Sequence, residues 1–114
     1  DLAVVNSDEN SISIWLGRGT GFFARANDYH VGRSPNAIVS VDLNGDSLVD
    51  LAVANYKDNS ISVMLSNGNG TFDNQIKYWS EIPCWYMISG DLNNDWKPDL
   101  LVINPGSTNL SVFS

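Results

Sequence analysis

Short apolar runs separated by polar turns form the main pattern of the chain. The segment 60–65 reads Ser-Ile-Ser-Val-Met-Leu, and this alternation is typical of a strand with one buried face. Asn67-Gly68-Asn69-Gly70, which follows it, is a strong turn signal. No segment keeps a 3.6-residue apolar period. The pattern therefore predicts an all-β chain, with strands in its central part at 37–41, 51–55, 60–65 and 75–79.

The chain repeats itself with a period of 49 residues. Asp1-Leu2-Ala3-Val4 corresponds to Asp50-Leu51-Ala52-Val53 and to Asp99-Leu100-Leu101-Val102. A period of about 40–50 residues is typical of propeller blades and repeat arrays, and four antiparallel strands make one β-propeller blade. We therefore expect about two and a third blades: a partial blade at 1–36, a complete blade at 37–85 and a partial blade at 86–114.

Two nine-residue loops within the repeats share the pattern D-L-N-x-D-x-x-x-D, and their oxygen-bearing side chains can converge on one hard cation. Calcium takes six to eight oxygen ligands from carboxylates, amides, backbone carbonyls and water. The first loop offers Asp42, Asn44, Asp46 and Asp50 together with the Leu48 carbonyl. The second loop offers Asp91, Asn93, Asp95 and Asp99 together with the Lys97 carbonyl. The sequence thus predicts two Ca²⁺ sites.

Other interpretations of these loops are weaker. An EF-hand needs a Glu at position 12 and flanking helices, whereas apolar strand residues follow position nine here. Magnesium prefers to keep several waters, and zinc is disfavoured because neither loop holds Cys or His. An acidic turn without metal stays open, since Asp and Asn favour turns.

The sixth loop position separates the two predicted sites. This position is usually Gly where the backbone turns sharply, but the chain has Ser47 in the first loop and Trp96 in the second. If a positive φ is needed there, Trp96 carries strain. We therefore expect the second site to bind calcium more weakly.

The charge and composition exclude several classes of function. The net charge of −7 argues against nucleic acid and against anionic membranes as partners. No stretch approaches the roughly 20 apolar residues of a membrane span, so no membrane insertion is expected. Cys84 is the only cysteine, and the lone His30 has no assigned catalytic partner. No catalytic motif or phosphate-binding loop is present, so we expect no enzyme activity.

Five further residues are candidates for modification or for contacts with a ligand. Asn69-Gly70-Thr71 and Asn109-Leu110-Ser111 match the N-glycosylation pattern, although an ordinary turn asparagine explains Asn69 equally well. Trp85, Tyr86 and Trp96 are candidate ligand or interface residues; the alternative is packing between blades, where aromatic side chains bury much area.

The run from Tyr29 to Asp46, continued by 51–55 and 68–72, resembles the FG-GAP/VCBS-type repeats of integrin α-subunits and many surface proteins. The resemblance implies calcium in the hairpin between the first two strands of each blade, and an extracellular or cell-surface location. Propellers of this family close with about seven blades. We therefore expect this chain to be incomplete as a closed propeller, and to need other copies of itself or the remaining repeats of a longer chain.

Two functions of different classes follow from these observations. The first is a calcium-binding β-propeller repeat module that acts in adhesion, binds a protein ligand, or serves as a structural, self-assembling scaffold such as a filament. The alternative is a lectin-like module that binds a glycan and accompanies an enzyme domain elsewhere. The chain begins at Asp1, the last position of a third acidic loop, so we expect it to be a piece of a longer protein.

Overall fold

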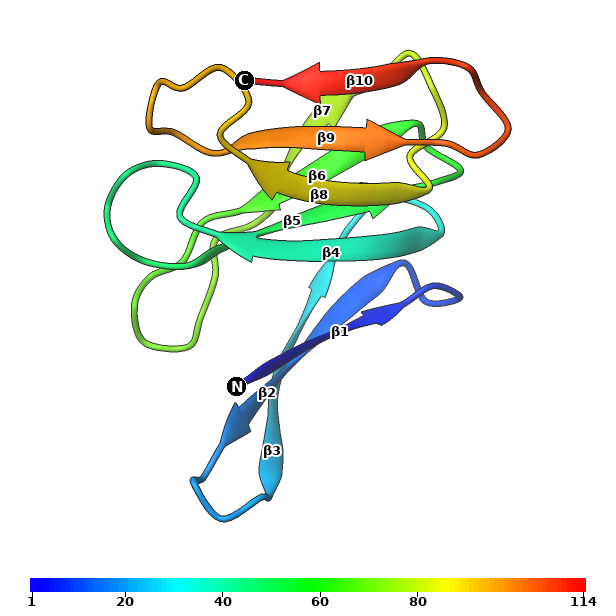
Figure 1. Ribbon diagram of the computed structural model, residues 1–114. Helices are drawn as coiled ribbons and strands as arrows, with labels where there is room; N and C mark the ends of the chain where they lie inside the picture. The colour runs from blue at the N-terminus through cyan, green and yellow to red at the C-terminus, as the bar shows by residue number, and fades with distance from the viewer.

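The computed structural model describes residues 1–114 and contains ten β-strands and no helix (Figure 1). The expected all-β fold is confirmed. The structure accordingly holds no helix that could span a membrane. The strands form three antiparallel sheets that do not close into a ring.

Each sheet is built from strands that are consecutive along the chain. The first sheet contains β1 (Leu2–Asn6), β2 (Ser11–Gly17) and β3 (Phe23–His30). The second contains β4 (Pro35–Val41), β5 (Asp50–Asn55), β6 (Ser60–Met64) and β7 (Ile76–Trp79). The third contains β8 (Tyr86–Gly90), β9 (Asp99–Ile103) and β10 (Leu110–Phe113). The central sheet thus has the four strands predicted for a blade, with β4 starting two residues earlier than expected.

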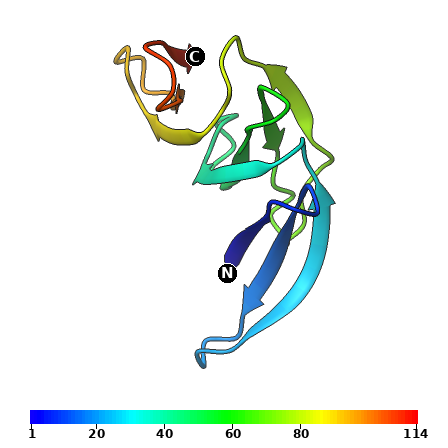
Figure 2. The same cartoon turned by 90° about the vertical axis from the view of Figure 1, so that its right-hand side faces the viewer.

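The central sheet lies between the other two, with the first sheet packed on one of its faces and the third sheet on the other (Figure 2). Successive side chains of a strand point to opposite faces, so β5 contributes to both interfaces. Leu51 and Val53 pack against the first sheet, whereas Ala52 and Ala54 pack against the third. Because both faces are covered, every residue of β5 and β6 is buried.

This two-sided burial corrects one expectation. The serines of the alternating segment 60–65 indicated an exposed face, yet Ser60 and Ser62 are fully buried. Asn55 on the neighbouring strand explains the difference, because its Nδ2 donates hydrogen bonds to Ser60 Oγ (3.2 Å) and Ser62 Oγ (2.9 Å). Buried polar groups are tolerated when they are hydrogen-bonded. Asn6 makes the same pair of bonds to Ser11 and Ser13 in the first sheet.

Candidate metal centre

The two acidic loops occupy the same place in their sheets. Residues 42–49 connect β4 to β5, and residues 91–98 connect β8 to β9, so each loop joins the first two strands of a sheet. Both loops project from the same side of the molecule, at the left in Figure 1. The repeat in the sequence is therefore a repeat in space.

The first loop brings three carboxylates together. One carboxylate oxygen from each of Asp42, Asp46 and Asp50 lies within 4.8 Å of the others. Asp50 is buried, Asp42 is half-buried and Asp46 is exposed. The cluster therefore extends from the protein interior to the solvent. The ion pairs of the chain involve Asp28 and Asp58, so this cluster has no basic partner. Three converging negative charges without such a partner form a group that could hold a metal ion.

Backbone donors shape this cluster. Asp42 accepts hydrogen bonds from the N–H groups of Gly45 (2.7 Å) and Ser47 (2.7 Å), and Asp46 accepts one from Leu48 N–H (2.8 Å). Partial burial alone would raise the pKa of Asp42. The hydrogen bonds from the backbone N–H groups of the following residues have the larger, opposite effect, so the pKa lies below its usual value. The Asp42 carboxylate is therefore ionised at neutral pH and fixed in orientation.

The ninth-position aspartate has a structural role that the sequence did not indicate. Asp50 accepts hydrogen bonds from Leu43 N–H at the start of the loop (2.9 Å) and from Ser66 N–H beyond β6 (2.8 Å). Asp1 accepts the corresponding bond from Gly17 N–H (2.9 Å). The donor follows its aspartate by the same 16 residues in both repeats, and this equal spacing is the signal that could have revealed the bond.

The second loop has the same turn but a looser cluster. Asp91 accepts hydrogen bonds from Asp95 N–H (3.1 Å) and Trp96 N–H (2.9 Å), and Lys97 N–H donates to Asp95 (2.9 Å). Asp91, Asp95 and Asp99 do not converge as the first three carboxylates do. Asp91 is exposed, whereas its counterpart in the first loop, Asp42, is half-buried.

The sixth position of each loop has the positive φ that was suspected. Ser47 has φ = 67° and Trp96 has φ = 66°. At the fourth position, the first loop has Gly45 (φ = 80°) and the second has Asn94 (φ = 60°). A left-handed backbone is costly for a bulky residue, whereas Gly and Asn tolerate it, so Trp96 is the most unfavourable of these four positions.

The three candidate aromatic residues are divided between two places. Trp85 and Tyr86 lie at the start of β8, and both are exposed, with the Trp85 ring edge-on to Tyr56 at 5.1 Å between centroids. Trp96 lies beyond the opposite end of β8 with 94% of its surface exposed. The strand separates the two groups by about 16 Å, so they do not form one continuous platform.

The two glycosylation candidates, the lone cysteine and the lone histidine lie apart from the acidic loops. Asn69 is exposed in the loop between β6 and β7, and Asn109 is exposed directly before β10. Cys84 is buried, and burial raises the pKa of its thiol, as befits an unreactive core cysteine. His30 is exposed at the end of β3.

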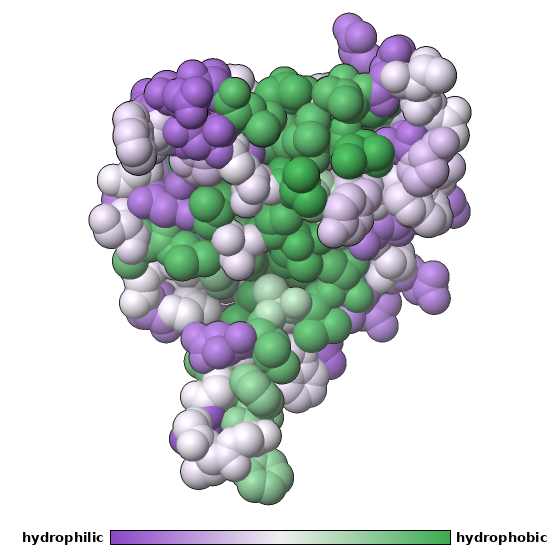
Figure 3. All heavy atoms as spheres, in the orientation of Figure 1, coloured by the Kyte–Doolittle hydropathy of each residue, from purple (hydrophilic) through white to green (hydrophobic).

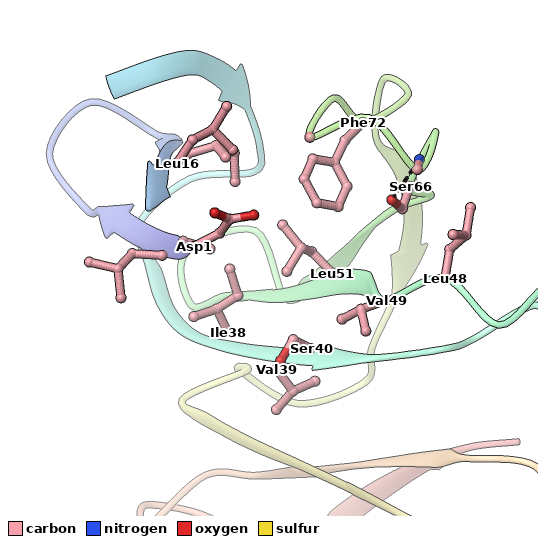
Figure 4. Close-up of a pocket in the computed structure, with 15 residues that line it drawn as sticks. Asp1, Leu16, Ile38, Val39, Ser40, Leu48, Val49, Leu51, Ser66 and Phe72 are labelled. Atoms are coloured by element: carbon pink, nitrogen blue, oxygen red, sulfur yellow. Dashed lines mark hydrogen bonds between the residues drawn. The ribbon is translucent and has the colours of Figure 1, made fainter. Parts of the chain in front are cut away.

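A cavity of about 500 Å³ lies between the first and second sheets (Figure 4). Its walls are mainly apolar: Leu16, Leu51 and Phe72 approach it from three different strands or loops. Asp1 is its one acidic residue, and this carboxylate is already bound to Gly17 N–H. The cavity therefore brings no cluster of titratable groups together.

The comparison with protein families gives one finding. The model of the FG-GAP-like repeat family matches residues 42–102, from the first acidic loop to within β9. No curated protein and no solved structure matches the chain significantly. The family match covers more than half of the chain and includes both acidic loops and the three strands β5, β6 and β7 of the central sheet. The chain therefore belongs to the family of FG-GAP-like repeats, and its sheets are β-propeller-type blades.

Proposed function

We propose that this chain is a calcium-stabilised repeat module of an extracellular or cell-surface protein, where it serves adhesion or the construction of a larger scaffold. FG-GAP-like repeats typically occur in such proteins. The observation that carries the proposal is the convergence of the Asp42, Asp46 and Asp50 carboxylates within 4.8 Å. The proposal assigns the chain no catalytic step.

The donor set of the first loop fits calcium better than other cations. Besides the three carboxylates, Asn44 supplies an amide oxygen and Leu48 a backbone carbonyl, and water completes the set of six to eight oxygens. Magnesium demands near-ideal octahedral geometry and retains several waters. Zinc prefers Cys and His, and the loop contains neither.

The ion would act structurally. Asp42 directly follows β4 and Asp50 is the first residue of β5, so an ion bound to both joins two neighbouring strands. It also offsets the repulsion between carboxylates that have no basic partner. A ligand that binds only the native state stabilises the fold by mass action. The expected affinity for an extracellular module is about 10⁻⁴–10⁻³ M.

Calorimetry of the chelator-stripped protein tests this proposal. Titration with CaCl₂ should show binding, and Asp46→Ala should weaken the first-loop site at least tenfold. Asp46→Asn keeps an acceptor for Leu48 N–H but removes a charge, so it separates loss of the ion from loss of the turn. Asp95→Ala, the matched change in the second loop, should leave the first site intact. An unchanged isotherm for both Asp46 variants would refute the site.

Glycan binding is a second candidate, favoured by the exposed aromatic side chains. Trp96 presents nearly its whole indole to solvent, and Trp85 and Tyr86 are exposed at the other end of β8. Aromatic rings combine a large apolar surface with a polar group, which suits the faces of sugar rings. A glycan array should show binding that Trp96→Ala or Trp85→Ala abolishes. Absence of binding to any glycan would remove this candidate.

A further inference from the structure

Three Asn-Gly pairs in the chain are chemical candidates for spontaneous deamidation. They are Asn44-Gly45 in the first acidic loop, and Asn67-Gly68 and Asn69-Gly70 in the loop between β6 and β7. In this reaction the backbone nitrogen of the second residue attacks the side-chain Cγ of the asparagine. Glycine has no side chain to hinder the attack, so the residue types favour all three pairs equally.

The hydrogen bonds of the attacking nitrogen differ between the three pairs. Gly45 N–H donates to the Asp42 carboxylate (2.7 Å), and Gly68 N–H donates to Ser66 Oγ (3.2 Å). Gly70 N–H makes no hydrogen bond within the chain. An N–H group that donates to a carboxylate or a hydroxyl must give up this bond before its nitrogen can lose the proton and attack. Gly70 therefore has the nitrogen that is most available for the reaction.

The asparagine side chains are also held differently. Asn44 is bound at both ends to one neighbour, because its Oδ1 accepts from Asp46 N–H (3.2 Å) and its Nδ2 donates to Asp46 Oδ2 (3.0 Å). Asn67 Nδ2 donates to Thr71 Oγ1 (3.2 Å). The Asn69 side chain is bound only at Oδ1, by Thr71 N–H (3.1 Å) and by the Thr71 hydroxyl (2.5 Å). Asn69 Nδ2, the group that must leave, is therefore unbound within the chain.

The two donors of Thr71 meet the atom where negative charge develops. When a nitrogen attacks Cγ, the C=O bond of the amide opens and its oxygen becomes an oxyanion. Donors that are already in place at this oxygen stabilise the charged intermediate. Asn69 Oδ1 has two such donors, and Asn67 Oδ1 has none. Asn44 Oδ1 has one, but it lies in a loop of converging carboxylates, whose charge opposes a further oxyanion.

Neighbouring contacts hold Thr71 in this position. Its carbonyl accepts a hydrogen bond from Asn67 N–H (3.0 Å), and the next residue, Phe72, donates its N–H to the Tyr29 hydroxyl (3.0 Å). Asn69 itself is exposed, so water and hydroxide reach its side chain. Figure 3 shows hydrophilic side chains on the left side of the molecule, where this loop and both acidic loops project in Figure 1.

We propose that Asn69 is a site of spontaneous deamidation in the folded protein, and that the fold protects Asn44 and Asn67. A base from the solvent removes the Gly70 amide proton, and the nitrogen forms a bond to Asn69 Cγ. The Cγ–Nδ2 bond then breaks, and Nδ2 takes up a proton and leaves as ammonia, which gives a cyclic succinimide. Water opens this ring at either carbonyl, to aspartate or to isoaspartate. The net reaction consumes one water and releases one ammonia, with no oxidant or reductant.

The product changes the loop that follows β6. Either product adds a negative charge, and isoaspartate also lengthens the backbone by a methylene group. The loop is joined to the first acidic loop, because Ser66 N–H donates to Asp50 (2.8 Å). Deamidation also removes the Asn69 amide nitrogen, to which an N-linked glycan would be attached. The reaction requires neither calcium nor a partner, so it is independent of the proposed function.

Incubation of the folded chain at mildly alkaline pH, followed by peptide mapping with tandem mass spectrometry, measures the three rates. Asn69 should deamidate about tenfold faster than Asn44, and faster than Asn67. Asn44 and Asn67 are matched internal controls, since each also precedes glycine. In urea, where the hydrogen bonds of the fold are lost, the three rates should become similar.

Substitutions in the loop test the hydrogen bonds directly. Thr71→Val removes the hydroxyl but keeps the N–H group, and should slow deamidation of Asn69 about fivefold. Thr71→Ser keeps the hydroxyl and should retain the wild-type rate. Ser66→Ala releases Gly68 N–H, so Asn67 should react faster while the rate at Asn69 stays the same. Circular dichroism verifies that each variant is folded.

Three results would overturn the proposal. Equal rates at Asn69 and Asn67 in the folded chain would show that their different hydrogen bonds do not matter. The same ranking of rates in urea would show that the local sequence, and not the fold, determines the site. An unchanged rate in Thr71→Val would exclude activation by the Thr71 hydroxyl.

Discussion

Backbone conformation at single residues distinguishes the two acidic loops more than their ligands do. Both loops offer the same four side-chain ligands at the same spacing. They differ where the backbone is left-handed: Gly45 and Ser47 in the first loop correspond to Asn94 and Trp96 in the second. The Trp96 side chain is almost entirely in solvent and so gains little from packing. Its conformational cost is therefore not offset by burial.

Replacing Trp96 by Gly should stabilise the second loop. The left-handed conformation costs an L-residue roughly 1–2 kcal/mol, while glycine adds chain entropy worth roughly 0.5–1 kcal/mol to the unfolded state. The free energy of unfolding, measured in urea, should therefore rise by about 0.5–1 kcal/mol. Ser47→Gly is the matched change in the first loop and should have a smaller effect. A decrease for Trp96→Gly would show that the indole makes stabilising contacts.

Several single-residue roles were not evident from the sequence because their partners are distant along the chain. Asp50 was expected only as a metal ligand, yet both of its oxygens also accept backbone hydrogen bonds, one of them from Ser66 N–H across the sheet. By contrast, a positive φ at Trp96 was considered from the sequence, because position six of such loops is usually Gly. Local geometry can be deduced from spacing, whereas contacts between strands require the register.

At the level of elements, the sequence predicted where the strands begin and end, but it did not predict that both faces of the central strands are buried. Apolar runs and Asn-Gly turns placed all four strands of the central sheet to within two residues. The burial of Ser60 and Ser62 was missed because serine is usually exposed. Hydrogen bonds from Asn55 Nδ2 to both hydroxyls, and one from Ser62 Oγ to Gln75 Oε1, make this burial tolerable. The same Asn and Ser positions recur in the first sheet.

Asp58 links three elements and should make stability depend on pH. Lying in the β5–β6 turn, it accepts hydrogen bonds from Arg33 Nε (2.7 Å), before β4, and Lys77 Nζ (3.0 Å), on β7. The hydrogen bond from the Arg33 side chain is the main cause that lowers the pKa of Asp58 from 3.8 to about 2, against the opposing effect of burial. Its charged form is therefore favoured by folding.

The Asp58→Asn variant should lose this stabilisation. Because the folded pKa lies below the unfolded one, the contribution is complete above about pH 4 and disappears as the pH falls toward 2. Solvent screening around the exposed Arg33 limits it to about 1 kcal/mol at pH 7. Urea unfolding from pH 7 to pH 3 should show a difference between wild type and variant that narrows below pH 4. A difference that does not change with pH would rule out the ionic contribution.

At the scale of the whole molecule, the central sheet would connect an ion bound in the first loop to the stability of all three blades. Loop residues 42–49 lead into β5, which is buried against both neighbouring sheets. In stacked repeats, stability is shared between each unit and its interfaces. The period in the sequence predicted the blades, but it could not show that the carboxylates converge in one loop and not in the other. The two loops also differ in burial: Leu43 packs against the core between the second and third sheets, whereas Leu92 is exposed.

Calcium should therefore raise the melting temperature of the entire chain in a single transition. At a free Ca²⁺ concentration ten times Kd, mass action stabilises the native state by about 1.4 kcal/mol, which is about 6–11 °C for a domain near 100 residues. Differential scanning calorimetry in chelator and in CaCl₂ measures this shift. Asp46→Ala should remove most of it and Asp95→Ala should remove little, because the converging carboxylates belong to the loop that precedes β5. Equal melting temperatures with and without calcium would leave the cluster as an acidic turn, and the stability of the stack would then come from packing between its sheets alone.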